Sequence, residues 1–147
     1  MNYLLDTNIL LHILRKSPLK EILEHDYDFE SEENNIFISV VTVGELYAIA
    51  IRNSWGEHRI KILKKIIKEY IIADIHSEDV LESYAQIDAF SQGKLPGKPL
   101  VLSARNMSKN DLWIAATASV LNATLITTDT DFDHLADNFL KLIRTTA

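Results

Sequence analysis

The sequence predicts an α/β fold built around a central, mainly parallel sheet. Short runs of apolar and β-branched residues alternate with longer segments in which apolar residues recur every three or four positions. This alternation is typical of parallel sheets, in which a helix connects each strand to the next. The chain of 147 residues is long enough for one hydrophobic core, so we expect a single domain over residues 1–147.

The first half of the chain is expected to contain two strands, each followed by helical segments. Ile9, Leu10, Ile13 and Leu14 recur at the spacing of one helix face, directly after an apolar run too short for a helix. The acidic segment 30–35 lacks apolar periodicity and is expected to form a loop. In chain order, we expect a strand at 2–5, helices at 7–16 and 19–25, a strand at 36–40 and a helix at 43–53.

The second half repeats this alternation and adds one long loop. Ile60, Leu63 and Ile67 lie on one face of an amphipathic helix. Residues 92–109 contain two glycines and two prolines, so we expect a loop. Because this loop leads into an acidic residue discussed below, we expect it to lie over the functional edge of the sheet. We expect helices at 57–70, 78–91, 110–121 and 131–136, and strands at 70–73, 123–127 and 139–143.

The composition excludes several kinds of site and location. The chain has no cysteine, which excludes disulfides and thiolate metal sites. No apolar stretch approaches the roughly 20 residues needed to cross a bilayer. The first residues show neither the basic region nor the small-residue cleavage site of a signal peptide. We therefore expect a cytoplasmic protein with no membrane segment.

The charge balance leaves the question of nucleic-acid binding open. A formal net charge of −6 argues against such binding by itself, because nucleic-acid binders usually carry a basic surface. The basic residues are, however, concentrated in the segments 59–68 and 94–109. Each segment is either a solvated face or a contact for phosphate, and the sequence allows both interpretations.

Four acidic residues adjoin short apolar runs that are spread along the whole chain. In a parallel sheet the carboxyl ends of the strands share one edge, so we expect the four carboxylates to converge there. Such a cluster repels itself unless a hard cation lies within it. The sequence therefore points to divalent metal chemistry. The four residues are Asp6, Glu45, Asp111 and Asp129.

Each of these acids also has a purely structural interpretation. Two of them stand three positions after a serine or threonine, which is the spacing of a helix capping box. The other two could be the N-caps of the helices that follow them. The capping-box pairs are Thr42 with Glu45 and Ser108 with Asp111, and the possible N-caps are Asp6 and Asp129.

Polar neighbours accompany the acids, which helix capping does not require. A hard cation takes a shell of carboxylate, amide, hydroxyl and water oxygens. Metal binding and capping are compatible, because a helix N-terminus can hold a carboxylate whose oxygens bind the ion. A hard-metal site with open positions can hydrolyse a phosphodiester bond. The neighbours are Thr7 and Asn8 after Asp6, Asn110 before Asp111, and Thr127, Thr128 and Asp131 around Asp129.

At these residues the chain resembles the PIN-domain ribonucleases, and in particular the VapC toxins of bacterial toxin–antitoxin pairs. Three elements carry the resemblance: the opening DTN, an S-x-x-T-x-x-E element and an ND-x-x-IAA element. Their order and spacing cover nearly the whole chain. They lie in the segments YLLDTNILLHIL, ISVVTVGELYAIA and KNDLWIAATASVLNATLITTDTDF, which a closing strand, FLKLI, follows.

The resemblance implies a three-layer α/β/α fold with a Mg²⁺- or Mn²⁺-dependent endonuclease site that cuts RNA. It also implies a homodimer that an antitoxin protein holds inactive by inserting a peptide into the active groove. These expectations concern activity, cofactor and partners, none of which follows from composition or periodicity alone.

The resemblance also assigns roles to individual residues. Asp6, Asp111 and Asp129 would bind metal, and Glu45 would bind metal or position the attacking water. These four are the expected catalytic residues. Asp131 would either share the fourth acidic role or only cap the short helix after it. The expected supporting residues are Thr7, Asn8, Ser39, Thr42, Asn110 and Asp131.

Two alternatives to the nuclease remain at the level of sequence. One is a phosphatase-like phosphoryl-transfer domain, although Asn8 stands where a haloacid-dehalogenase-like enzyme would need a second aspartate. The other is a non-catalytic α/β binding module, in which the acids are caps and the basic helix at 57–70 binds a partner. Convergence of the four carboxylates would favour the nuclease, and wide separation would favour the binding module.

Overall fold

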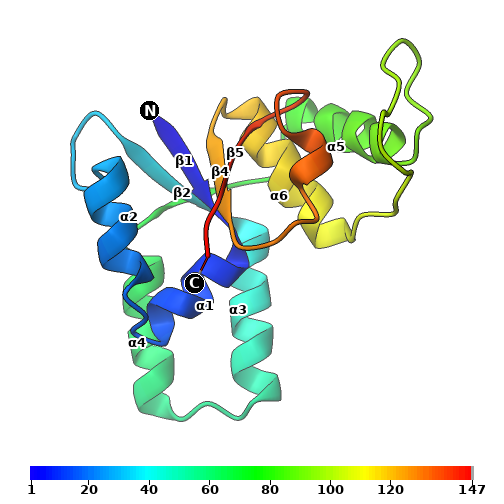
Figure 1. The fold of residues 1–147 in the computed structure, drawn as a ribbon. Coiled ribbons are helices and arrows are strands. Elements are labelled where there is room, and N and C mark those ends of the chain that lie inside the picture. The colour runs from blue at the N-terminus through cyan, green and yellow to red at the C-terminus, as the bar shows by residue number, and fades with distance from the viewer. Residues whose placement is uncertain (147) are drawn as a thin grey trace.

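In the computed structural model, which describes residues 1–146, five strands form one sheet whose neighbouring strands are all parallel (Figure 1). The strand order is β3-β2-β1-β4-β5, so β1 lies at the centre. Leu5 is level with Ile38 of β2 and Ile126 of β4, so these strands end at the same edge. The strands are β1 (Asn2–Leu5), β2 (Asn35–Ser39), β3 (Ile71–Ala73), β4 (Thr124–Thr127) and β5 (Lys141–Arg144).

Helices cover both faces of the sheet, which confirms the expected three-layer α/β/α architecture (Figure 1). Helices α1 to α4 pack on one face, and α5, α6 and the 3₁₀ helix η1 pack on the other. Among the described residues, no helix is both long enough and apolar enough to cross a membrane. The helices are α1 (Thr7–Leu14), α2 (Leu19–Tyr27), α3 (Val40–Arg52), α4 (Glu57–Ile67), α5 (Glu78–Ser91), α6 (Lys109–Val120) and η1 (Asp133–Leu135).

Side-chain alternation along β1 produces the two halves of the core. Leu4 faces the layer of α5 and α6, where it joins a cluster that includes Phe132. Leu5 faces the opposite layer and joins a cluster that includes Leu46 of α3. Both leucines are fully buried, and a buried side chain of this size stabilises the fold by about 1.5–3 kcal/mol. The central strand is therefore held from both sides.

Helix α3 begins earlier than its periodicity predicts. It starts at Val40, because the Ser39 Oγ accepts the Val41 N–H at 3.1 Å and caps the helix at the end of β2. The capping box predicted for Thr42 and Glu45 is therefore wrong, since Thr42 lies within the helix. This earlier start places both residues close to the carboxyl edge of the sheet.

The segment after β4 is less helical than predicted. Only the 3₁₀ helix η1 forms within the helix expected at 131–136, and its N-cap position is occupied by Phe132. Asp129 Oδ1 instead accepts the Asp131 N–H at 3.0 Å in a local turn. Neither aspartate caps a helix, so the capping interpretation is wrong for both.

The connection between α5 and α6 is the long loop that its glycines and prolines predict. Residues 92–108 contain no helix or strand. Gly93 and Gly97 have φ angles of 72° and 76°, in the left-handed region that glycine adopts at little steric cost. The Arg105 N–H donates to the Ser91 carbonyl at 2.8 Å, which fastens the loop to the end of α5.

Two substitutions on α3 test the assignment of its buried face. Leu46→Ala is expected to lower the free energy of unfolding by about 2–5 kcal/mol, because it opens a cavity at a fully buried position. Ile51→Ala lies on the same helix but is 80% exposed, so a change within about 0.5 kcal/mol is expected. Urea unfolding followed by circular dichroism measures both. Equal losses for the two variants would contradict the assignment.

Candidate functional site

Five acidic side chains gather where the central strands end. Asp6 directly follows β1, and Asp129 lies two residues after β4. Glu45 extends from the second turn of α3, and Asp111 from the first turn of α6. Asp131 completes the group from the turn after β4. The four carboxylates expected at this edge therefore come from four separate segments, and one further acid joins them.

The carboxylate of Asp6 is buried and held at both oxygens. Its side chain is the N-cap of α1, with Oδ1 accepting the Thr7 N–H at 2.8 Å. Oδ2 accepts the Thr127 hydroxyl at 2.7 Å. The Asp6 N–H donates to the Ile126 carbonyl at 3.0 Å, which extends the pairing of β1 with β4 by one residue. With 4% of its surface exposed, Asp6 has one orientation and two fixed oxygens.

A chain of hydroxyls connects this edge to Glu45. The Thr7 hydroxyl donates to Glu45 Oε1 at 3.0 Å and lies 3.0 Å from the Thr42 hydroxyl, which can in turn donate to it. Thr7 and Thr42 are both buried. Thr7 therefore contributes its backbone to Asp6 and its side chain to Glu45, and it fixes the two carboxylates relative to each other.

Asp111, Asp129 and Asp131 form a second group, with one carboxylate oxygen from each lying within 4.8 Å of the others. Asp129 is oriented by the turn described above, and its N–H donates to the Thr127 Oγ1 at 3.0 Å. The same Thr127 hydroxyl donates to Asp6, so it links the buried carboxylate to the outer group. Spacing of this kind suits one cation bound between the three oxygens.

The electrostatics of the edge are those of an unneutralised acidic cluster. Burial raises the pKa of Asp111 to about 6, and the charges of Asp6, Asp129 and Asp131 add to this rise against a lowering hydrogen bond with Ser108. Burial likewise raises the pKa of Asp6, with Glu45 and Asp129 adding repulsion. A bound cation would relieve this repulsion and so stabilise the cluster.

Within residues 1–146, no lysine, arginine or histidine forms an ion pair with any of these five carboxylates. The donor set is made of oxygens only, from carboxylates and nearby hydroxyls, which is the chemistry that Mg²⁺, Mn²⁺ and Ca²⁺ select. The residues present therefore fit a hard divalent cation.

The other predicted residues differ in how they relate to the acidic cluster. Asp131 lies in the outer group, whereas Glu45 does not, although both were candidates. Ser108 caps α6 by accepting the Asp111 N–H at 3.2 Å, which is the serine half of the capping box predicted there. Asn8 is half-buried and Asn110 is exposed, and neither has a hydrogen bond that ties it to the acids. Thr127, which the sequence marks only as a neighbour of Asp129, proves to be the link between the two groups.

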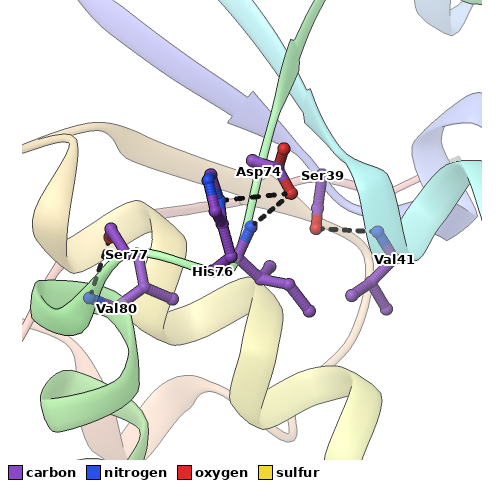
Figure 2. A network of polar contacts seen from close by, with 7 residues as sticks. Ser39, Val41, Asp74, His76, Ser77 and Val80 are labelled. Carbon is purple, nitrogen blue, oxygen red and sulfur yellow. Dashed lines mark hydrogen bonds and ion pairs between the residues drawn. The ribbon is translucent and has the colours of Figure 1, made fainter.

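Asp74 shows that position after a strand is not sufficient. Asp74 follows β3, and Figure 2 shows it beside Ser39 at the end of the neighbouring strand. Its Oδ1 accepts the Ile75 N–H at 3.1 Å and lies 3.7 Å from the His76 Nδ1, and its side chain is 69% exposed. Because β3 is an edge strand, two strands away from β1, Asp74 lies outside the cluster and satisfies its own turn. The Ser39 hydroxyl is likewise used by α3 (Figure 2).

Two grooves open onto the acidic edge. One, of about 430 Å³, is lined by Glu45, Asn110 and Trp113 and extends along α3 to Arg52. The other, of about 470 Å³, lies between the loop segment 103–108 and the outer acids. The long loop thus borders the site, as its position before Asp111 predicts.

The sequence matches one protein-family model over most of its length. The family model described as the PIN domain matches residues 3–138. The chain belongs to the PIN domain family. This confirms the family expected from the DTN, S-x-x-T-x-x-E and ND-x-x-IAA elements.

Known relatives of this PIN domain carry the name VapC. Ribonuclease VapC2 of Haemophilus influenzae is 29% identical over 119 residues, which cover 80% of this chain and 79% of the relative. Ribonuclease VapC1 of H. influenzae strain R2866 is 28% identical over 138 residues, which cover 93% of this chain and 94% of the relative.

Solved VapBC structures share the fold of this PIN domain. VapBC-1 from nontypeable H. influenzae superposes with a TM-score of 0.75 at 25% identity and covers 98% of each chain. VapBC2 from Rickettsia felis, bound to a DNA fragment from its promoter, superposes with a TM-score of 0.77 at 24% identity over 99% of this chain and 100% of the other. The second likeness concerns the fold alone.

The raised pKa of Asp111 predicts how metal-free stability depends on pH. The unfolded carboxyl has a pKa of 3.8 and the folded one about 6, so the folded state binds more protons between these values. Ionisation of Asp111 therefore reduces stability as pH rises through this window, and the full loss persists above it.

Asp111→Asn removes this loss of stability. In EDTA we expect the variant to melt about 3 °C above the wild type near pH 7.5, and to show no gain near pH 4. Differential scanning calorimetry at both pH values measures the effect. A gain of equal size at the two pH values would contradict the electrostatic explanation.

Proposed function

We propose that this PIN domain is a metal-dependent endoribonuclease and the toxin of a toxin–antitoxin pair. Relatives named ribonuclease VapC support the RNA-cleaving activity, since their alignments with this chain cover most of both sequences. The observation that carries the proposal is the cluster of oxygens from Asp111, Asp129 and Asp131 within 4.8 Å, without a basic partner. Helix capping requires no such mutual approach, so the cluster favours the nuclease over the binding module.

For the cofactor we propose Mg²⁺ or Mn²⁺. Asp6, Asp111 and Asp129 would hold the ion, and Asp131 would share the fourth acidic position. When bound, such an ion supplies Lewis acidity that activates water and stabilises the charge of a phosphodiester undergoing hydrolysis. The PIN family and the all-oxygen donor set support a divalent cation.

The chain's own residues would supply orientation. Thr127 and the Thr7 N–H each occupy one oxygen of Asp6, which directs the remaining lone pairs of that carboxylate. Thr7 occupies one oxygen of Glu45, which leaves the other free to accept a proton from water or to contact metal. Glu45 also lines the groove toward Asn110, so it can face an RNA backbone lying there.

Partners and assembly follow from the relatives. The solved relatives are VapBC toxin–antitoxin complexes, so we propose that an antitoxin protein binds this chain. We also propose a homodimer and a cytoplasmic location for a single domain over residues 1–147. Apolar Tyr47 and Ile51, which are 41% and 80% exposed on α3, provide surface for a protein partner.

Cleavage of a mixed RNA pool tests the activity. The wild type is expected to cut with Mg²⁺ or Mn²⁺ and to lose activity in EDTA. Asp6→Asn and Asp111→Asn are expected to lower cleavage at least about 100-fold, because each removes charge at the metal while keeping the side-chain shape. Asp74→Asn is the matched control at the outer strand and should cut like the wild type. Full activity in Asp6→Asn, or cleavage that survives EDTA, would refute the proposal.

Substitution of Thr127 tests the orientation of Asp6. Thr127→Val keeps the shape but removes the hydroxyl that donates to Asp6, so we expect cleavage to fall about tenfold with little change in RNA affinity. Thr127→Ser retains the hydroxyl and should restore most of the activity. If valine and serine at this position gave the same rate, the hydrogen bond would have no role in catalysis.

A further inference from the structure

A serine and a histidine form a hydrogen bond in the interior, away from the acids. Ser91 is the last residue of α5, and His134 is the central residue of η1. The Ser91 Oγ lies 2.7 Å from the His134 Nε2, and the two side chains are 0% and 3% exposed. The imidazole stacks on Phe90 with centroids 6.3 Å apart and planes 4° from parallel. The pair is thus enclosed by apolar side chains.

This pair places polar atoms in an apolar layer. By strict hydrogen-bond geometry the His134 Nδ1 has no partner among the described residues, yet the Asp131 backbone acts on the ring as a hydrogen-bond partner that raises its pKa. An unsatisfied buried polar atom is unfavourable, and replacement of both partners by apolar groups of similar shape is often neutral or stabilising. Burial lowers the pKa of His134, and the charge of Arg105 lowers it further, whereas the Asp131 backbone opposes the shift. The ring is therefore close to both Arg105 and Asp131, which line the same groove.

Ser91 connects the segments on either side of the groove between residues 103–108 and Asp131, which we call the outer groove. Its carbonyl accepts the Arg105 N–H at 2.8 Å, and its hydroxyl lies 3.3 Å from the Met107 sulfur as well as beside His134. Arg105 and Met107 belong to the wall formed by residues 103–108, which faces Asp131 across the groove. Ser91 thus contacts one wall directly and reaches the other through His134, three residues after Asp131.

The position of Asp131 depends on the same connection. Its N–H donates to Asp129 on one side, and three residues later His134 is held by Ser91. Phe132, fully buried between them, fixes the backbone of this short turn. Asp131 is exposed, so its place beside Asp111 is set by these backbone attachments and not by packing of its own side chain.

We infer that Ser91 and His134 are positioning residues that fix both walls of the outer groove and thereby hold Asp131 beside Asp111. The inference rests on the proposed metal site for its effect on cation binding. The positioning itself is independent of metal, so it can be measured on the metal-free protein.

The experiment uses the full chain with Ser91→Ala, His134→Phe, the double variant and His134→Gln. Hydrogen–deuterium exchange in EDTA is expected to accelerate about tenfold in residues 103–108 and 129–133 for both single variants. Mn²⁺ affinity, measured by calorimetry without RNA, is expected to fall about tenfold. His134→Gln keeps an amide at the place of Nε2 and should restore both quantities.

The double variant separates positioning from stability. It removes both polar partners, so its melting temperature should recover toward the wild type while fast exchange and weak Mn²⁺ binding persist. Thr117→Ala is the matched control, because it removes another buried hydroxyl from the same layer and should change neither quantity.

Each outcome has a distinct meaning. Unchanged exchange at both walls in the single variants would overturn the inference, whatever the metal does. Normal Mn²⁺ affinity in the double variant would also overturn it. If the wild type bound no Mn²⁺, the proposed function would fail, while coupled loss of protection at the two walls would still support the positioning role.

Discussion

The acidic edge depends on one buried carboxylate held at the end of the central strand. Asp6 caps α1 with its side chain, continues the pairing of β1 with β4 through its N–H, and accepts the hydroxyl of Thr127. These contacts join the central strands to the first helix at a single point. Thr7 and Thr127 then extend the network to the Glu45 carboxylate and the Asp129 backbone, so these two acids are held relative to Asp6.

This arrangement opposes stability in the metal-free state. Burial and mutual repulsion raise the pKa values of Asp6 and Asp111, and the described chain supplies no basic side chain in compensation. The two-sided apolar core around β1 must therefore offset the repulsion. A cation that binds the folded state would return part of this free energy, by an amount that grows with the logarithm of its concentration relative to its dissociation constant. Stability and the proposed metal binding thus compete at Asp6 and Asp111.

The molecule separates the groups that would bind the ion from the groups that orient them. Buried hydroxyls of Thr7, Thr42 and Thr127 hold the inner acids, because hydroxyls can orient a carboxylate without neutralising its charge. The outer acid Asp131 lacks such a hydroxyl and relies on its turn, which Ser91 and His134 connect to the long loop. The loop that borders the groove is thereby connected to the turn that carries Asp131.

Apolar periodicity and the position of acids beside short apolar runs are local properties, so they were enough to predict the order of strands and helices, the parallel sheet, the long loop and the four acids at its edge. The sequence by itself did not determine that Thr127 would contact Asp6 across 121 positions, that Asp131 would join the outer group, or that Ser91 would meet His134. It also misplaced the start of α3, where a cap at Ser39 overrode the periodicity. These contacts depend on tertiary packing, since strand register and side-chain direction fix distances of a few ångströms between residues that have no local relation along the chain.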